Sequence, residues 1–300
     1  MTQSSRLVFF GTEAFSVPTL HALIAAGYSI VAIVTKPNSR RGRGKKTFIH
    51  PIKQIGLDHS IPVLQPEKVG ELEHELRELT PDAAILVSYG KIIPERILNV
   101  FEPIGIINIH PSLLPRYRGP SPIEAAILAG DKITGVSIMK LDAGMDTGPI
   151  FAQRTTALTG TETKPELSQQ LAITGAKLLL EVLPDILSGT LQPEKQQNND
   201  VSVTSLIQKK DGKLDPLTDT AYALDRKVRA YQGYPKPHLT IADNDVIVTS
   251  AKIIDSVYSD RLIIPCAQST YLEVLELTAP SGRSMSGSDF VRGYINRPKS

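Results

Sequence analysis

Short apolar runs alternate with amphipathic stretches along the N-terminal part of the chain. Leu7–Phe10 and Ser29–Thr35 are apolar runs of strand length, and Phe15–Ala26 between them carries apolar residues at helical spacing. A strand, a helix and a second strand in this order form a βαβ unit, which builds parallel sheets. The pattern therefore predicts an α/β domain with a parallel sheet.

The same pattern continues as far as the helix that ends near Leu187. It predicts further strands at Ala83–Ser88, Gly105–His110, Val136–Leu141 and Ile150–Thr155, and helices at Pro66–Leu79, Pro122–Ala129 and Lys164–Leu187. In an open parallel sheet, ligands bind beyond the carboxyl ends of the strands. Polar residues that follow these predicted strands are therefore the first candidates for chemistry.

Polar residues dominate from Ser188 to Ser202, which is typical of a linker. Beyond it, the pattern predicts a helix at Ala221–Tyr231 and short strands at His238–Ile241, Asp245–Ile254, Arg261–Pro265 and Tyr271–Leu277. These strands fit a small barrel or a sandwich, and a five-stranded OB-like barrel would fit the same segment. We expect a first domain over residues 1–189, a linker over 190–204 and a second domain over 205–300.

Composition narrows the class of protein. Hydrophobic residues make up 41% of the chain and charged residues 21%, which is typical of a globular protein. No apolar run is long enough to span a bilayer and the start shows no signal-peptide pattern, so we expect a cytoplasmic protein without a membrane partner. Cys266 is the single cysteine and the histidines lack metal-ligand spacing, so we expect no disulfide and no bound metal. We also expect a monomer.

Asn108 and His110 interrupt the apolar strand Gly105–His110 just before a proline ends it. Residues two apart on a strand point to the same face, so an amide and an imidazole lie side by side. Asp146 follows the next predicted strand. The amide and a protonated imidazole can donate to a developing oxyanion, and the carboxylate can accept protons, which together suit acyl transfer.

Each of these residues also has an ordinary explanation. An Asn-x-His pair on a strand is often a satisfied hydrogen-bonding pair of the core, and an aspartate before Thr147-Gly148-Pro149 is often a turn residue. The turns Ser112–Pro115 and Ser88–Gly90 beside the pair are either plain loop packing or apolar walls for a flat ligand ring. The bond between Leu114 and Pro115 is expected to be cis, because the chain must turn sharply there.

Six cations and no acid occupy the eleven residues from Lys36 to Lys46. The cations other than Lys36 are Arg40, Arg41, Arg43, Lys45 and Lys46, and two glycines among them predict a mobile loop. Such a loop suits a phosphate backbone, although many charge runs are only solvated surface. Arg226 and Arg229, three residues apart on the predicted helix at 221–231, are a second candidate for RNA contact.

The composite motif NIHPSLLPRYRG, followed by LDAGMDTGPI, resembles the formyltransferase family that uses 10-formyltetrahydrofolate. The segments FFGTEAFSVPTLHALI, KPNSRRGRGKK and LDRKVRAYQGYPKP are similar to the branch of that family that formylates methionine on initiator methionyl-tRNA. The resemblance covers essentially the whole chain. It implies a Rossmann-like catalytic domain, an OB-like tRNA-binding domain and 10-formyltetrahydrofolate as the formyl-donor cosubstrate.

The resemblance also implies roles for single residues. It makes Asn108, His110 and Asp146 catalytic and makes Ser112, Leu113, Leu114 and Pro115 contacts of the folate, to which we add Ser88, Tyr89 and Gly90. The implied reaction moves a formyl group to the α-amino group of methionine for translation initiation. Transfer to another amine, such as a nucleotide sugar, and a non-catalytic RNA-binding role are the alternatives. A dehydrogenase is disfavoured, because the turn after the first strand has one glycine where a dinucleotide fingerprint needs three.

Overall fold

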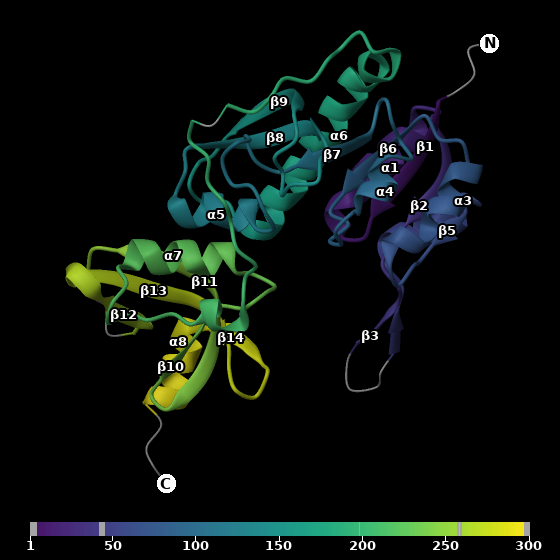
Figure 1. The fold of residues 1–300 in the computed structure, drawn as a ribbon. Coiled ribbons are helices and arrows are strands. Elements are labelled where there is room, and N and C mark those ends of the chain that lie inside the picture. Colours follow the sequence, from purple (N-terminus) through teal and green to yellow (C-terminus); the bar gives the residue numbers. More distant parts are fainter. Residues whose placement is uncertain (1–4, 42–45, 198, 257, 259, 297–300) are drawn as a thin grey trace. The chain divides into compact units, whose positions relative to one another are not determined.

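The computed structural model describes residues 5–41, 46–197, 199–256, 258 and 260–296. The chain divides into two compact units (Figure 1). The first unit contains Met1–Gly119, Thr134–Ala157 and Ser168–Val203, and the second contains Pro120–Ile133, Leu158–Leu167 and Thr204–Ser300. Each unit has a sheet and a hydrophobic core of its own.

A mixed sheet in the order β5-β2-β1-β6-β7-β8-β9 forms the centre of the first unit. Its strands are β1 (Arg6–Gly11), β2 (Ser29–Val34), β5 (Val63–Leu64), β6 (Ala83–Val87), β7 (Ile106–His110), β8 (Ile133–Lys140) and β9 (Ile150–Ala157). The strands from β5 to β7 run parallel, whereas β8 is antiparallel to β7. The predicted parallel α/β sheet is confirmed, but the strand at 136–141 does not continue it in parallel.

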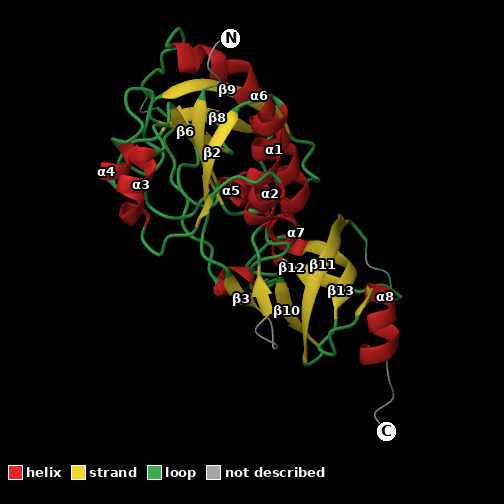
Figure 2. Cartoon of the chain, turned by 90° about the vertical axis from the view of Figure 1, so that its right-hand side faces the viewer, coloured by secondary structure: helices red, strands yellow, loops and turns green. Residues whose placement is uncertain are grey.

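Helices accompany this sheet (Figure 2). They are α1 (Val17–Ala25), α2 (Pro51–Asp58), α3 (Glu73–Glu78), α4 (Glu95–Leu98) and α6 (Lys164–Ser188). The helix predicted over 66–79 is reduced to a 3-10 turn, Val69–Leu72, and the short α3. The sequence did not predict α2, which contains Gly56. That glycine lets α2 approach β5, since a Cβ there would lie 2.4 Å from the Val63 Cγ2 atom.

Side chains alternate between the two faces of the sheet and thereby set the direction of the candidate residues. Phe10 and its neighbours on one face pack edge-to-face against Tyr89 and Phe101, with centroid distances of 5.5 Å and 6.0 Å. On the other face Ile109 lies against α6, where a Cβ on Gly175 would be 2.7 Å from the Ile109 Cγ2 atom. Residues 108 and 110 therefore point away from α6.

The second unit contains an antiparallel sheet in the order β10-β11-β13-β12, with β14 paired to β13. The strands are β10 (His238–Ile241), β11 (Asn244–Ile254), β12 (Ile263–Cys266), β13 (Thr270–Thr278) and β14 (Ser284–Ser286), and the helices are α5 (Pro122–Ala129), α7 (Ala221–Ala230) and α8 (Gly287–Phe290). Register shifts around Ser250 bend β11 and curl the sheet. Its core joins Leu224, Val228 and Phe290 to the strands, and the predicted small β domain is confirmed.

The cationic segment differs from its prediction as a loop. Its two ends form a hairpin, in which β3 (Ser39–Arg41) pairs antiparallel with β4 (Lys46–Phe48). A glycine-containing stretch between two short strands is also a hairpin pattern, which accounts for the difference. Arg43 and Lys45, together with the glycines at 42 and 44, lie outside the described residues. No helix among the described residues combines the length and the apolar character that a bilayer crossing requires.

Candidate active site

Asn108 and His110 lie at the carboxyl end of β7, as the strand pattern predicts. Their relative exposures are 6% and 5%, so both side chains are buried. Asn108 is paired with Leu86 of the parallel neighbour β6 and with Met139 of β8, and His110 is opposite Ser137. The two polar side chains thus share one face at the end of a strand that is apolar everywhere else.

The amide of Asn108 makes no side-chain hydrogen bond to any residue that the structure describes. The side chain is largely buried, but its polar atoms are not sealed from solvent, so water can occupy the place of a protein partner. The explanation of Asn108 as a satisfied member of the core therefore fails. Its N–H groups are available to a bound molecule.

The imidazole of His110 lies between two oxygen atoms of the first unit. Its Nε2 is 2.9 Å from the carbonyl oxygen of Tyr117, and its Nδ1 is 3.7 Å from Oδ2 of Asp146. A carbonyl only accepts hydrogen bonds, so Nε2 carries the proton. At 3.7 Å, Nδ1 and the Asp146 oxygen are close neighbours but too far apart for a direct hydrogen bond. Because both nitrogens face protein atoms, His110 is a less direct oxyanion donor than the sequence suggested, and Asn108 is the free one.

Asp146 reaches His110 by a route that the sequence did not predict. Since β8 is antiparallel, its last residue, Lys140, lies opposite Ile107 at the start of β7, and the loop over residues 141–149 carries Asp146 back toward His110. Asp146 has a left-handed backbone with φ of 53°. Its Oδ2 also accepts a hydrogen bond of 2.8 Å from the Gly119 amide, and its Oδ1 has no hydrogen bond to a described residue.

The Ser112–Pro115 turn is held by buried hydrogen bonds around Ser137. The Ser137 hydroxyl donates to the carbonyl of Ser112 at 2.7 Å and accepts from the Leu114 amide at 3.1 Å. Leu114 is 4% exposed, and the Leu114–Pro115 bond is cis, which confirms that prediction. Leu114 and Pro115 line a groove of about 640 Å³ together with β9 residues and the segment from Leu191 to Asp200.

The turn after β6 lies at the same edge of the sheet but has a different character. Ser88 and Gly90 are left-handed, with φ of 46° and 70°. The ring of Tyr89 is fully buried in the core, and its hydroxyl has no hydrogen-bond partner among the described residues. Burial raises the pKa of this phenol to about 12. The ring therefore does not form the ligand wall that we expected. The backbone carbonyl of Tyr89 accepts a hydrogen bond from the Thr12 hydroxyl at 3.3 Å.

Residues 190–204 are expected to be a linker, but the structure assigns those up to Val203 to the first unit. Several of them make specific contacts with the loops around His110 and Asp146. Ile150 and Glu194 exchange backbone hydrogen bonds of 2.8 Å, and the Tyr117 amide donates to the Ser202 hydroxyl at 2.8 Å. Gln196 bonds to both loops. Sequence reasoning missed these residues, because a polar stretch that packs through hydrogen bonds has the same composition as a solvated linker.

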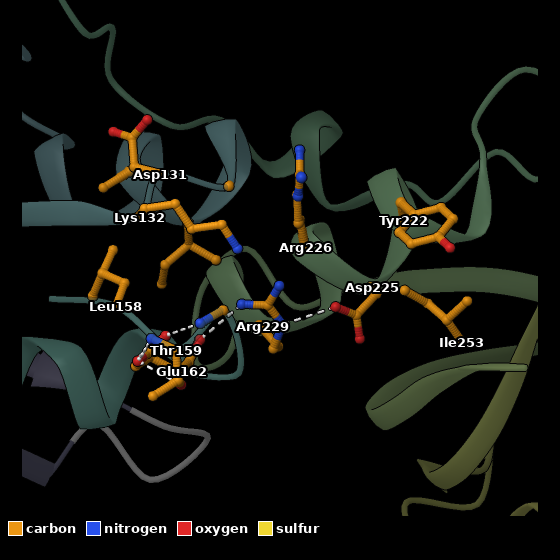
Figure 3. Close-up of a pocket in the computed structure, with 14 residues that line it drawn as sticks. Asp131, Lys132, Leu158, Thr159, Glu162, Tyr222, Asp225, Arg226, Arg229 and Ile253 are labelled. Atoms are coloured by element: carbon orange, nitrogen blue, oxygen red, sulfur yellow. Dashed lines mark hydrogen bonds and ion pairs between the residues drawn. The ribbon is translucent and has the colours of Figure 1, made fainter.

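The arginines predicted to bind RNA on α7 have protein partners, and Figure 3 shows those of Arg229. Arg229 donates to the Asp225 carboxylate at 2.9 Å and to the Glu162 carbonyl at 3.0 Å. Arg226 donates to the carbonyl of Ala129, the last residue of α5, at 3.1 Å. These contacts close a small pocket of about 180 Å³ within the second unit. They give both arginines a structural role, so the predicted RNA contact has no support from this geometry.

Three of the remaining predicted cations lie on the described strands of the hairpin, and Lys36 precedes them. Arg40, Arg41 and Lys46 belong to β3 and β4. Lys36, just before them, lies at the carboxyl edge of the sheet, where its Nζ atom would be 2.4 Å from a Cβ on Gly90. Within the described part of the chain, no group of three His, Cys, Asp or Glu side chains could hold a metal ion.

The chain was compared with known proteins. A family model described as Formyl transferase matches residues 5–183, and one described as Formyl transferase, C-terminal domain, matches residues 206–295. Relatives named methionyl-tRNA formyltransferase from Chloroflexus aggregans and Methylococcus capsulatus are each 37% identical, over 96% of this chain and 97% of each relative. A solved N-formyltransferase from Helicobacter canadensis, in complex with folinic acid and dTDP-3-aminofucose, has a TM-score of 0.70 at 18% identity, covering 91% of this chain and 99% of that chain. This last likeness concerns the fold alone.

Proposed function

Because the chain belongs to the formyl transferase family, we propose that the centre at Asn108, His110 and Asp146 moves a formyl group to an amine. The enzyme transfers this group to the α-amino group of methionine on initiator methionyl-tRNA, the substrate named for its relatives. The formyl donor is a folate derivative, 10-formyltetrahydrofolate. The observation that carries the proposal is the Asn108 amide, which has no hydrogen bond to a described residue and lies two residues from His110 on the same face of β7, beside the His110–Asp146 pair.

The residues divide the chemistry between them. The neutral amine adds to the formyl carbon, and the carbonyl oxygen becomes an oxyanion that accepts from the Asn108 amide. The amine loses a proton, for which Oδ1 of Asp146 is the available acceptor. The bond between the formyl carbon and N10 of the folate then breaks, and N10 takes up a proton as it leaves. The imidazole of His110 lies beside the Asp146 carboxylate and, when protonated, stabilises both the carboxylate and the developing oxyanion.

The turns at the ends of β6 and β7 are the proposed place for the folate. Ser88–Gly90 and Ser112–Pro115 follow adjacent parallel strands, so both lie at the edge of the sheet where ligands of such folds bind. Because the Tyr89 ring is buried in the core, its contribution is limited to its backbone. The Ser112–Pro115 turn is held by the Ser137 hydroxyl, which bonds to the Ser112 carbonyl and the Leu114 amide.

The cationic hairpin is the proposed contact of the tRNA. Arg40, Arg41, Arg43, Lys45 and Lys46 concentrate positive charge in one segment that begins after Lys36, at the same edge of the sheet. Phosphate contacts of this kind make binding depend strongly on salt. A tRNA substrate also implies a cytoplasmic enzyme, and we propose that one chain is sufficient for activity.

A competition between acceptors tests this proposal. The enzyme is given 10-formyltetrahydrofolate with charged initiator tRNA, and in parallel with a nucleotide-linked amino sugar, the other class of acceptor that this fold serves. We expect formylation of the methionyl-tRNA only, with kcat/KM falling steeply as salt is raised. Formylation of the sugar nucleotide, with none of the tRNA, would reject the proposed acceptor and retain the formyl transfer.

A further inference from the structure

The side-chain amide of Gln196 uses all of its hydrogen-bonding capacity on the two loops that enclose the candidate active site. Its oxygen accepts from Nε and Nη2 of Arg118 at 3.0 Å and 2.7 Å. Its nitrogen donates to the carbonyls of Asp146 and Gly148, both at 2.8 Å. An amide offers two donors and two acceptor positions, so Gln196 is saturated by this set of contacts.

The same two loops position the reacting pair. The loop of Tyr117 to Gly119 provides the carbonyl that accepts from His110 and the amide that donates to Asp146. The loop around Asp146 provides the carboxylate itself. No backbone–backbone hydrogen bond between these loops appears among the described residues, and the side chains of Gln196, Asp146 and His110 all bridge them.

Backbone conformation adds to the argument. Tyr117 and Asp146 both have left-handed backbones, with φ of 55° and 53°. Residues other than glycine adopt this region rarely, and they persist there only where the surroundings fix them. Gln196 binds the carbonyl of one of these residues directly and reaches the other through its neighbour Arg118.

We propose that Gln196 is a positioning residue for the formyl transfer: its amide fixes the backbone of Asp146 against the 117–119 loop, so that the carboxylate stays at His110. This inference rests on the proposed function for its catalytic consequence. It concerns geometry in the first unit only, and it assigns a task to a segment that composition marks as a linker.

Two substitutions separate positioning from general stabilisation. Gln196→Glu keeps the shape and the acceptor for Arg118 but turns a carboxylate oxygen toward the two carbonyls, whereas Gln196→Ala removes every contact. We expect kcat to fall about 10- to 100-fold in both variants, with the KM for the folate changed less than about threefold. As the pH is lowered from neutrality, the carboxyl group introduced by Gln196→Glu gains a proton and can donate again. The activity of that variant relative to wild type should then rise, and that of Gln196→Ala should not.

Gln169→Glu is the matched control, because it introduces the same charge on an exposed side chain of α6, in the first unit and outside the groove beside Pro115. Amide hydrogen exchange at Gly119 gives a readout that needs no turnover, since this N–H bonds to the Asp146 carboxylate. Protection at Gly119 should fall about tenfold or more in both Gln196 variants and stay unchanged in Gln169→Glu.

The outcomes separate this inference from the proposed function. A wild-type enzyme inactive on charged initiator tRNA would reject the proposed function, while the exchange at Gly119 would still test the positioning. Gln196 variants with near wild-type kcat, a lowered kcat with unchanged Gly119 protection, or an equal loss in Gln169→Glu would each overturn the inference.

Discussion

Removal of the Asn108 amide separates a catalytic role from a structural one. Asn108→Ala deletes the one unpaired donor at the proposed oxyanion position, and loss of such a donor typically lowers kcat about 100- to 1000-fold, or roughly 3–4 kcal/mol of transition-state stabilisation. Stability should behave in the opposite way. The side chain has no hydrogen bond to lose among the described residues, so the free energy of unfolding should change by less than about 1 kcal/mol, or increase.

Ser137→Ala is the structural counterpart, since Ser137 lies opposite His110 on β8 and is fully buried. Its hydroxyl makes three hydrogen bonds, to the Ser112 carbonyl, the Leu114 amide and the Gln153 side chain. The substitution leaves buried partners unsatisfied and should cost about 1–3 kcal/mol of stability.

Single-turnover formyl transfer measures the first quantity and urea unfolding measures the second. The predicted signature is an inactive but stable Asn108→Ala and a destabilised Ser137→Ala that retains more activity. The reasoning is refuted if Asn108→Ala turns over within about threefold of wild type, or if it loses more than about 2 kcal/mol of stability.

Three further substitutions test separate features. Asp146→Asn should lower turnover about 100-fold or more, because shape survives but the proton acceptor does not; a normal rate in single-turnover assays would exclude the carboxylate from proton transfer. Tyr89→Phe removes a buried hydroxyl without a partner and should leave stability unchanged or raise it by up to about 1 kcal/mol. Burial raises the pKa of the Tyr89 phenol to about 12, so the folded state keeps this proton at pH values where the unfolded state loses it. The free energy of unfolding of the wild type should therefore decline as the pH rises above the usual tyrosine pKa. An alkaline decline of equal size in Tyr89→Phe would contradict this assignment. Burial alone would raise the pKa of Glu162, but hydrogen bonds from Thr159 and Gly160 outweigh it and lower that pKa. Glu162→Gln should therefore lower the free energy of unfolding by about 1 kcal/mol near neutral pH. This difference should vanish as the pH falls through the lowered pKa of Glu162, and urea unfolding that shows the same difference in acid would disprove the assignment.

Hydrophobic periodicity was sufficient for most of the fold. The buried parallel strands β1, β2 and β6 are nearly continuous apolar runs, and β7 is apolar apart from its two polar residues; this is the pattern of strands covered on both faces. The helices α1, α5, α6 and α7 carry clear helical spacing. Asn108 and His110 could be found because two polar residues stand out in a strand that is otherwise apolar. Strand direction could not be found in this way, because periodicity is the same for β8 in either orientation.

The hydrogen-bond partners of individual side chains could not be predicted from the sequence. Arg226 and Arg229 look like free cations in the sequence, and their acceptors, Ala129 and Glu162, are far away along the chain. Gln196 is the opposite case: it looks like linker composition and is saturated with hydrogen bonds. Tyr89 sits in a turn between predicted strand and loop, where periodicity gives no direction to the ring.

The most direct test of the central claim follows the formyl carbon itself. Wild-type enzyme and Asn108→Ala are each mixed with isotopically labelled 10-formyltetrahydrofolate and charged initiator tRNA, and the methionine released from the tRNA is analysed by mass spectrometry. The account predicts label on the α-amino group of methionine with the wild type and a rate at least about 100-fold lower with Asn108→Ala. Label that appears only as free formate, or on methionine at equal rates with both proteins, would contradict it.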